Sequence, residues 1–180
     1  MVKNPNKVKN LIGLVPQDIA LYPNLTAKEN LRYFGRLFGL KGKYLEKRVN
    51  ESLDFVELTR RCDDRIATYS GGMKRRINLA AGLLHEPKIL FLDEPTVGID
   101  AQSRNMILGK LAFVKEKGTT LIYTTHYMEE AQHLCTKVVF IDQGRRIAQG
   151  RPQELIARSR ECDDLGQLFL KLTGKELRDL

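Results

Sequence analysis

The sequence lacks the features that mark membrane, secreted or fibrous proteins. Among its 180 residues, no window approaches the roughly 18 uninterrupted apolar residues of a membrane-spanning helix. The basic segment 1–10 is not followed by the apolar stretch of a secretion signal. Only 14 glycines and 6 prolines accompany 42% hydrophobic and 29% charged residues, which excludes collagen-like and disordered chains. We therefore expect a soluble globular chain with one domain, or one domain and a small appendage.

Cysteine is also scarce. Cys62, Cys135 and Cys162 lie far apart without CxxC spacing, so neither a disulfide framework nor a zinc site is predicted. Free cysteines of this kind pack as small hydrophobic residues and indicate a reducing, cytosolic compartment. The net charge of +8 permits an anionic partner, but the basic residues are spread along the chain. We interpret short basic clusters such as residues 74–76 as part of a solvated face.

The hydrophobic pattern predicts an α/β fold. Apolar runs of strand length, without polar alternation, are typical of a parallel sheet covered on both faces. These runs lie at residues 11–15, 89–92, 120–124 and 137–141. Between the first two runs the apolar residues recur at helical spacing, beginning after a capping box at Thr26–Glu29. The sequence therefore predicts an α/β core that is interrupted by a helical insertion.

An acidic pair follows the second strand. A parallel strand delivers its carboxyl end to the ligand side of the sheet, so Asp93 and Glu94 should face a binding crevice. There Asp93 could hold Mg²⁺ and Glu94 could polarise an attacking water. Taken alone, the same pair could also end a strand in an ordinary surface turn.

A glycine-rich helix start lies 23 residues before Asp93. Ser70 is placed to cap this helix, and Gly71 and Gly72 permit close approach of another group to the backbone. Free amides and the helix dipole together predict an anion site. The plain alternative is a glycine-rich helix cap without a ligand.

Two more polar residues follow predicted strands. Gln17 comes after the strand at 11–15, and His126 comes after the strand at 120–124. Either could be a ligand-facing residue or a polar loop residue. We keep the second interpretation for His85 and His133.

The order of these segments resembles the nucleotide-binding domain of ABC ATPases. Five segments match the Q-loop, signature, Walker B motif, D-loop and switch histidine of that family: Val15–Gln17, Ser70–Arg76, Leu90–Thr96, Gly98–Asp100 and Thr124–His126. Five motifs in the right order are highly specific, and the resemblance covers essentially the whole chain. It implies a RecA-like P-loop NTPase core with a mostly parallel sheet, plus an inserted all-α helical subdomain.

The same resemblance implies four segments along the chain. They are a Q-loop region, a helical subdomain with the signature, a RecA-like core with Walker B, D-loop and switch histidine, and C-terminal helices. Their expected bounds are 1–20, 21–86, 87–150 and 151–180.

In the family, two such domains hold two ATP molecules between them. The resemblance implies that Ser70 and the amides of Gly71 and Gly72 clamp the γ-phosphate of ATP bound to the other subunit. It also implies that Asp100 communicates between the two sites.

The resemblance assigns catalytic roles to the remaining matched residues. Glu94 would be the general base, and His126 would contact the γ-phosphate. Asp93 and Gln17 would contact Mg²⁺ and the attacking water. ATP and Mg²⁺ are thus the implied cofactors.

One part of the family's pattern is missing. The phosphate-binding motif GxxxxGK[ST], or Walker A, should precede Gln17, and only 16 residues do so. Elsewhere, Gly39–Tyr44 has the wrong glycine spacing, and Gly174–Glu176 lacks the required hydroxyl. We expect a C-terminal fragment without Walker A and the N-terminal strands, with uncovered sheet edges. Such a chain should bind ATP weakly and not hydrolyse it.

Among ABC proteins, transporter ATPases fit best. Gln17 and Ser70 are 53 residues apart, which leaves no room for the coiled coil of chromosome-associated members. The zinc cysteines of repair proteins and the tandem domains of translation factors are also missing. The segments Gln17–Pro23, Ser70–Arg76 and Leu172–Asp179 resemble the ABC-2 type exporters of the daunorubicin-resistance-like group.

That group resemblance implies partners. It implies a homodimer or a second ATPase subunit, and a separate ABC-2 type permease whose cytoplasmic helix docks near Gln17 and the helix over 31–40. It further implies no nucleic-acid partner, no transmembrane segment, and a peripheral position at the cytoplasmic, inner face of the cell membrane.

One alternative is a catalytically inert interaction module that offers its signature in trans. A DNA- or ribosome-associated ABC ATPase is a less favoured alternative.

Overall fold

The computed structural model describes residues 8–159 and 161–174, so the last residues of the Leu172–Asp179 motif and of Gly174–Glu176 lie outside the described part. The chain forms two compact units, residues 1–124 and 125–180, which are described separately. The four segments expected from the sequence stay a prediction about the intact domain. None of the described helices combines the length and hydropathy needed to cross a membrane.

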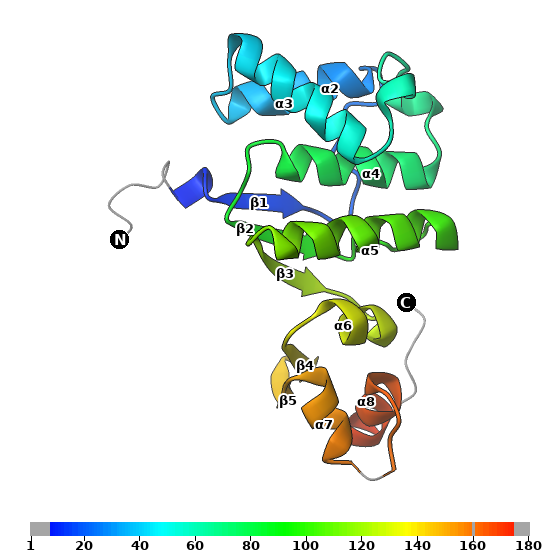
Figure 1. The fold of residues 1–180 in the computed structure, drawn as a ribbon. Coiled ribbons are helices and arrows are strands. Elements are labelled where there is room, and N and C mark those ends of the chain that lie inside the picture. Colours follow the sequence, from blue (N-terminus) through cyan, green and yellow to red (C-terminus); the bar gives the residue numbers. More distant parts are fainter. Residues whose placement is uncertain (1–7, 160, 175–180) are drawn as a thin grey trace. The chain divides into compact units, whose positions relative to one another are not determined.

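The described residues of the first unit contain a three-stranded parallel sheet and the helices α2 to α5 (Figure 1). The strands stand in the order β1 (Ile12–Val15), β2 (Ile89–Asp93) and β3 (Thr120–Thr124). The helices are α2 (Ala27–Leu37), α3 (Gly42–Phe55), α4 (Gly71–Leu83) and α5 (Ala101–Glu116), with 3-10 turns at Thr59–Arg61 and Ile66–Thr68. The expected α/β class with a parallel sheet and a helical insertion between β1 and β2 is confirmed.

Helices α2, α3 and α4 share a hydrophobic core of their own. Leu31, Val49 and Ile77, one from each helix, are completely buried in it. The predicted capping box opens α2: Glu29 N–H donates to Thr26 Oγ1 (3.1 Å), and Thr26 N–H donates to Glu29 Oε2 (2.8 Å). A stripe at helical spacing plus a strong cap therefore accounts for this insertion.

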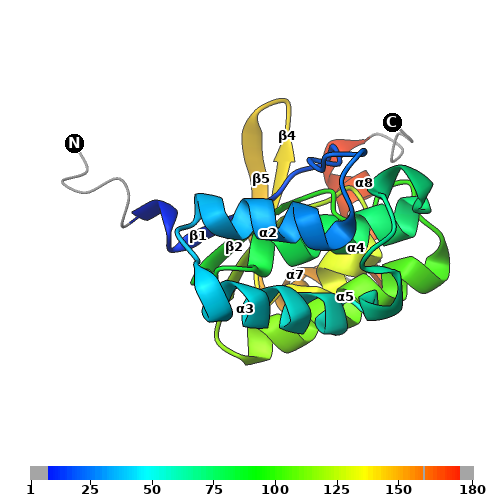
Figure 2. The ribbon, with the colours of Figure 1, turned by 90° about the horizontal axis from the view of Figure 1, so that it is seen from above.

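Helix α4 is shared by the helical core and the sheet. Figure 1 shows it running between β1 and the pair α2 and α3, and Figure 2 shows the same helices from above. A Cβ atom added at Gly13 would lie 2.3 Å from the Gly82 carbonyl oxygen, and one added at Gly82 would lie 2.7 Å from Val15 Cγ2. The two glycines thus let α4 lie directly on β1.

The opposite face of the sheet is open. The register aligns Leu14 with Phe91 and Phe91 with Ile122, which forms an apolar row across the three strands. Leu14 is 60% exposed and Ile122 is 43% exposed. The expectation of a sheet covered on both faces is therefore wrong for this face, because the apolar side chains that β1 and β3 contribute to the row are exposed.

The second unit is a hairpin with three short helices. Strands β4 (Val138–Asp142) and β5 (Arg145–Gly150) pair antiparallel. Between them, Gln143 and Gly144 both have positive φ (48° and 72°), as tight hairpin turns require. The helices are α6 (Met128–Leu134), α7 (Pro152–Ala157) and α8 (Leu165–Thr173), and they bury Phe140, Leu155 and Leu165. The expectation that the run at 137–141 joins the parallel sheet is wrong, because its partner among the described residues is β5.

The open row predicts binding of a dye that reports exposed apolar surface. We expect 8-anilinonaphthalene-1-sulfonate to fluoresce with the folded chain, and the double variant Leu14→Ser with Ile122→Ser to lose roughly half of that fluorescence. The control is Leu37→Ser, because Leu37 is 65% exposed but lies on α2. Equal fluorescence of the double variant and the wild type would contradict this prediction.

A half-buried histidine, His85, predicts pH-dependent stability. The His85 ring stacks on Phe38 with 3.6 Å between centroids, and its Nε2 lies 2.9 Å from the Ile12 carbonyl oxygen. Burial lowers the pKa of His85, so folding favours the neutral ring. This contribution is complete above the ordinary pKa of about 6.5 and is lost as the pH falls below it. In urea unfolding, we expect His85→Phe to lose less stability than the wild type between pH 7.5 and pH 5.

Candidate functional site

The carboxyl ends of β1 and β2 carry three of the predicted site residues. Pro16 ends β1, and the exposed Gln17 follows it. Asp93 is the last residue of β2, and its Oδ1 accepts a hydrogen bond from Thr124 Oγ1 at the end of β3 (2.5 Å). Glu94 follows, and its N–H donates to the Thr124 carbonyl (3.1 Å). Neighbouring parallel strands therefore bring Gln17, Asp93 and Glu94 to one edge of the sheet.

Glu94 has a strained backbone. Its φ of 44° lies in the left-handed region, which costs a non-glycine residue on the order of 1 kcal/mol or more. The hydrogen bond to Thr124 and a turn bond from Val97 N–H to the Glu94 carbonyl (3.2 Å) maintain this conformation. Strain of this kind concentrates at functional sites, so it supports a chemical role for the half-buried Glu94 side chain.

The glycine-rich start of α4 forms a second group. Ser70 caps the helix, with its Oγ accepting from Met73 N–H (3.2 Å). Gly72 packs so closely on α5 that an added Cβ would lie 2.1 Å from Ser103 Oγ. At Gly71 an added Cβ would meet only the Gly98 carbonyl oxygen, at 3.8 Å. Gly72 thus permits the close packing of α4 on α5, whereas Gly71 leaves the start of α4 accessible.

Asp100 lies beside this helix start. It caps α5, and its two carboxylate oxygens accept hydrogen bonds from Ser103 N–H and Ser103 Oγ (both 2.8 Å). These bonds, the backbone one first, hold the pKa of Asp100 below its usual range. An added Cβ at Gly72 would lie 3.3 Å from Asp100 Oδ2, so the predicted signature and D-loop are in contact.

Two residues of α4 that sequence reasoning left without a role connect the groups. The buried Arg75 donates from Nη1 to the Gln17 carbonyl. The buried Asn78 donates from Nδ2 to the Pro16 carbonyl (3.2 Å) and accepts at Oδ1 from Ala20 N–H (3.3 Å). Together they clamp the segment that follows β1 onto the helix that carries Ser70.

Arg75 is also close to the acidic residues of the site. Burial lowers the pKa of Arg75, while the charges of Asp18 and Glu94 act in the opposite direction and favour the guanidinium ion. The interpretation of residues 74–76 as a solvated face is therefore wrong for Arg75. It is also wrong for Arg76, which is half-buried and donates to the Val56 carbonyl (3.0 Å). A sequence signal existed, because Gly72, Arg75 and Asn78 recur at helical spacing with Gly82.

His126 belongs to the second unit. Its half-buried ring lies 4.1 Å from the ring of Tyr127. Of the predicted residues, the first unit therefore contains Gln17, Asp93 and Glu94 at the strand ends, and Ser70, Gly71, Gly72 and Asp100 at the helix starts.

The donor set fits an Mg²⁺–phosphate ligand better than a metal bound by protein alone. The described residues contain no cluster of three or more His, Cys, Asp or Glu that could hold a metal ion. Mg²⁺ in phosphate sites needs only one or two carboxylates and keeps several waters. Asp93 and the Gln17 amide, both exposed, can supply such a partial set. The accessible amino end of α4 suits an anion.

Comparison with known proteins points in the same direction. The family model described as ABC transporter matches residues 2–97. The linearmycin resistance ATP-binding protein LnrL of Bacillus subtilis (strain 168) is 53% identical over 156 residues, which cover 87% of this chain and 50% of that protein. The Nod factor export ATP-binding protein I of Ralstonia nicotianae is 42% identical over 88% of this chain and 49% of its own length.

Solved structures agree. An ATP-binding subunit of an ABC transporter superimposes with a TM-score of 0.81 at 28% identity, over 94% of this chain and 71% of that one. The cbiO1 protein of Clostridium perfringens, part of the ABC transporter complex cbiONQ, gives a TM-score of 0.75 at 32% identity, over 84% and 61%. The chain spans about half the length of the curated relatives it matches. By motif order, fold and sequence, this chain belongs to the ABC transporter family of ATP-binding proteins.

Proposed function

We propose that this chain is part of the ATP-driven motor subunit of an ABC-2 type export transporter, where ATP held between two such domains drives a membrane permease. The observation that carries the proposal is the convergence of Gln17, Asp93 and Glu94 at one sheet edge, joined through Arg75 to the helix that begins at Ser70. The name of the Nod factor export relative supports export as the direction of transport.

The roles of the strand-end residues follow from their chemistry. Glu94 takes a proton from the water that attacks the γ-phosphate, and His126 contacts that phosphate. Asp93 and Gln17 would hold Mg²⁺, and the bound ion would neutralise charge on the phosphate oxygens. Support comes from the fixed position of Asp93 on Thr124 and from the strained turn at Glu94.

The helix-start residues act on a second subunit. Ser70 and Gly71 are exposed, whereas Gly72 is fixed against Ser103. This arrangement suits a helix start that meets the γ-phosphate of ATP on a partner domain, either an identical copy or a second ATPase subunit. Asp100, in contact with that helix start, would pass the state of one site to the other.

The permease would dock on α2 and the segment around Gln17. Tyr22 and Tyr33 are exposed there, with ring centroids 4.9 Å apart and hydroxyls 3.1 Å apart. Leu37 on α2 is also exposed, while Leu31 is in the core as expected. Aromatic rings of this kind suit a cytoplasmic helix of a membrane protein, so we infer a position at the inner face of the membrane.

A second candidate function is a catalytically inert interaction module. It is favoured by one observation: Ser70 and Gly71, at the start of α4, are exposed and therefore accessible to a partner subunit. Such a chain would still offer Ser70 and Gly71 in trans to an intact ABC subunit.

The missing motif predicts that the 180-residue chain does not hydrolyse ATP. Without the amide cradle and its lysine, most contacts to the β- and γ-phosphates are lost. Isothermal titration should show no saturable ATP binding in the micromolar range, and phosphate release should stay at background. Stoichiometric micromolar binding would contradict this.

Joining the chain to the N-terminal part of the Bacillus subtilis relative should restore turnover, and then Glu94→Gln should lower phosphate release. The expected loss is about 10²–10⁴-fold, because a positioned general base is removed while ATP binding is kept. The matched control is Glu116→Gln, an exposed carboxylate at the end of α5. A near-wild-type rate for Glu94→Gln would refute its role as the base.

The clamp from α4 predicts a local dynamic effect. We expect Arg75→Ala to speed backbone hydrogen exchange over residues 17–20 about tenfold or more, because a charged hydrogen bond is worth about 1.5–3 kcal/mol. The control is Lys74→Ala, a neighbouring cation on the same helix. Unchanged exchange over 17–20 in Arg75→Ala would show that the guanidinium does not hold this segment.

A further inference from the structure

The first unit has a groove at the ends of the strands opposite to the candidate site. It lies between α3, the end of α4 and the end of α5, and has a volume of about 970 Å³. Lys88, which precedes β2, and Thr119, which precedes β3, line it, so it lies at the amino ends of the strands. Nothing in the proposed ATP chemistry uses this groove.

The groove has an apolar part where helices α3 and α5 face each other. Phe55 of α3 and Phe113 of α5 line it, with ring centroids 6.1 Å apart. Phe113 is 49% exposed, whereas the next residue of α5, Val114, is buried. An exposed aromatic side chain in a concave surface is a common anchor point for a partner.

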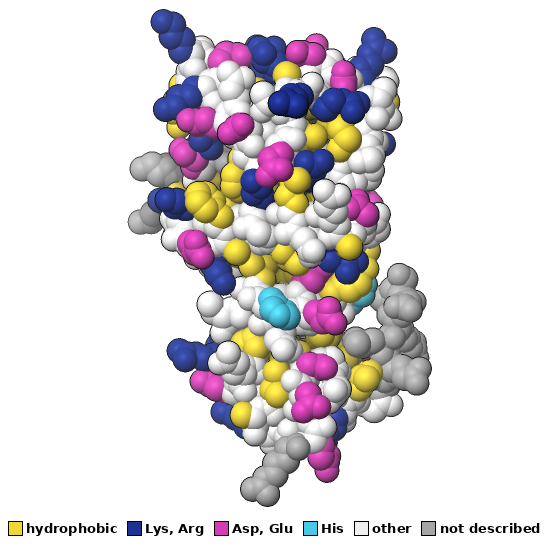
Figure 3. Space-filling view, turned by 45° about the vertical axis from the view of Figure 1, so that its right-hand side comes forward, with side chains coloured by type: hydrophobic (Ala, Val, Ile, Leu, Met, Phe, Trp, Pro, Cys, Tyr) yellow, Lys and Arg dark blue, Asp and Glu magenta, His cyan; other side chains and the backbone are white. Residues whose placement is uncertain are grey.

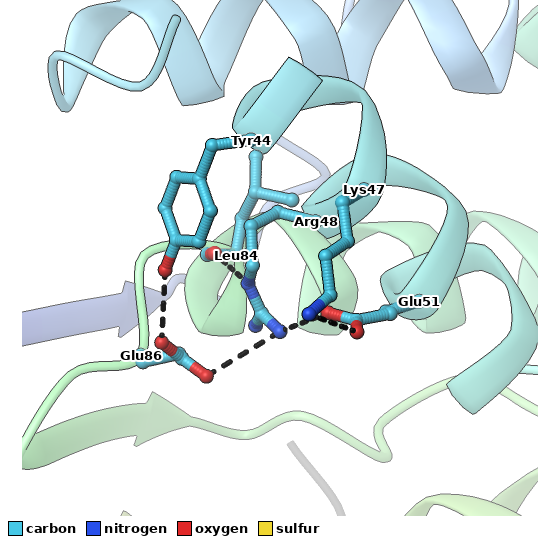
Figure 4. Close-up of polar contacts among 6 residues, drawn as sticks. All are labelled: Tyr44, Lys47, Arg48, Glu51, Leu84 and Glu86. Carbon is cyan, nitrogen blue, oxygen red and sulfur yellow. Dashed lines mark hydrogen bonds and ion pairs between the residues drawn. The ribbon is translucent and has the colours of Figure 1, made fainter.

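The carboxylates of the groove are already neutralised by its own cations. Figure 4 shows Arg48 between them: its Nη1 lies 2.6 Å from Glu51 Oε2 and 3.4 Å from Glu86 Oε1. Tyr44 also donates to Glu86 (3.3 Å), and Lys47 lies 3.7 Å from Glu51. This network fixes Glu86, whose φ of 56° is in the left-handed region.

Two other lysines of the groove keep their charge available. Lys88 and Lys117 are exposed, and no carboxylate of the described residues pairs with either. The Lys117 ammonium lies 5.3 Å from the centre of the Phe113 ring, so the charge and the apolar anchor are adjacent. The groove therefore combines an apolar wall with uncompensated positive charge.

We propose that this groove binds an amphipathic α-helix of a partner protein, with apolar side chains on one face and Asp or Glu beside them. The apolar face lies on Phe55 and Phe113, and the carboxylates reach Lys88 and Lys117. A helix about 10 Å wide encloses roughly 850 Å³ in two turns, so the groove accommodates about two turns. Because the groove is remote from Gln17 and Glu94 along the strands, this site does not depend on the proposed ATPase role.

The test uses a labelled synthetic helix as the probe. The peptide has about 14 residues, with Leu and Phe at positions i, i+3, i+4 and i+7 and Glu beside them. A control peptide replaces each Glu by Lys. We expect saturable binding of the acidic peptide to the full chain in fluorescence anisotropy, and much weaker binding of the basic one.

Matched variants locate the binding. We expect Lys88→Glu with Lys117→Glu, and separately Phe113→Ala, to weaken the acidic peptide about tenfold. The control pair Arg60→Glu with Lys137→Glu reverses two exposed charges elsewhere and should leave the affinity unchanged. Circular dichroism confirms that each variant is folded.

Several outcomes would overturn the proposal. Absence of peptide binding, equal binding of the basic peptide, or equal loss in the control pair would each reject the site. Binding of phosphatidylglycerol vesicles that needs Lys88 and Lys117, without peptide binding, would assign the groove to an anionic lipid surface instead. Self-association lost in Phe113→Ala would assign it to a second copy of this chain.

Discussion

The arrangement of the site depends on two buried polar side chains of α4. Arg75 and Asn78 would be costly to bury alone, and they are satisfied by the backbone of Pro16, Gln17 and Ala20. Because α4 also packs against β1 through Gly13 and Gly82, the helix and the segment after β1 move as one piece. The glycine-rich start of the same helix is therefore mechanically joined to the strand ends. The hydrogen bonds of Arg75 and Asn78, together with the close packing at Gly13 and Gly82, make this connection without a larger hydrophobic core.

The fold was largely predictable from the sequence, and the reason is physical. The helical stripe around Leu31 and the capping box at Thr26 are local signals, and the structure contains both. The apolar run at 89–92 is bounded by Pro87 and by the acidic pair Asp93 and Glu94. These boundaries predicted the central strand. The turn residues Gln143 and Gly144 are a local signal for the hairpin of β4 and β5. Periodicity alone, however, could not show that β4 lies outside the parallel sheet, because strand partners depend on contacts between distant segments.

The candidate site was predictable only in part. Asp93 and Glu94 were found because strand ends have a known polarity in parallel sheets. Arg75 was not found, because a short basic cluster looks the same whether its side chains are solvated or buried under a loop. Its burial results from the segment after β1 packing on α4, which the basic cluster does not reveal. The local sign of that burial is the helical spacing of Arg75 with Gly72, Asn78 and Gly82. The strained φ of Glu94 is likewise a product of tertiary hydrogen bonds with Thr124.

The open face of the three-stranded sheet is a surface on which non-native association can begin. Apolar side chains in a regular row, beside an unpaired edge of β3, are the feature that chaperones hold and that other unfolded chains adhere to. Any polypeptide segment that covers Leu14, Phe91 and Ile122, whether in the same molecule or in another, would therefore protect this part of the fold from non-native association.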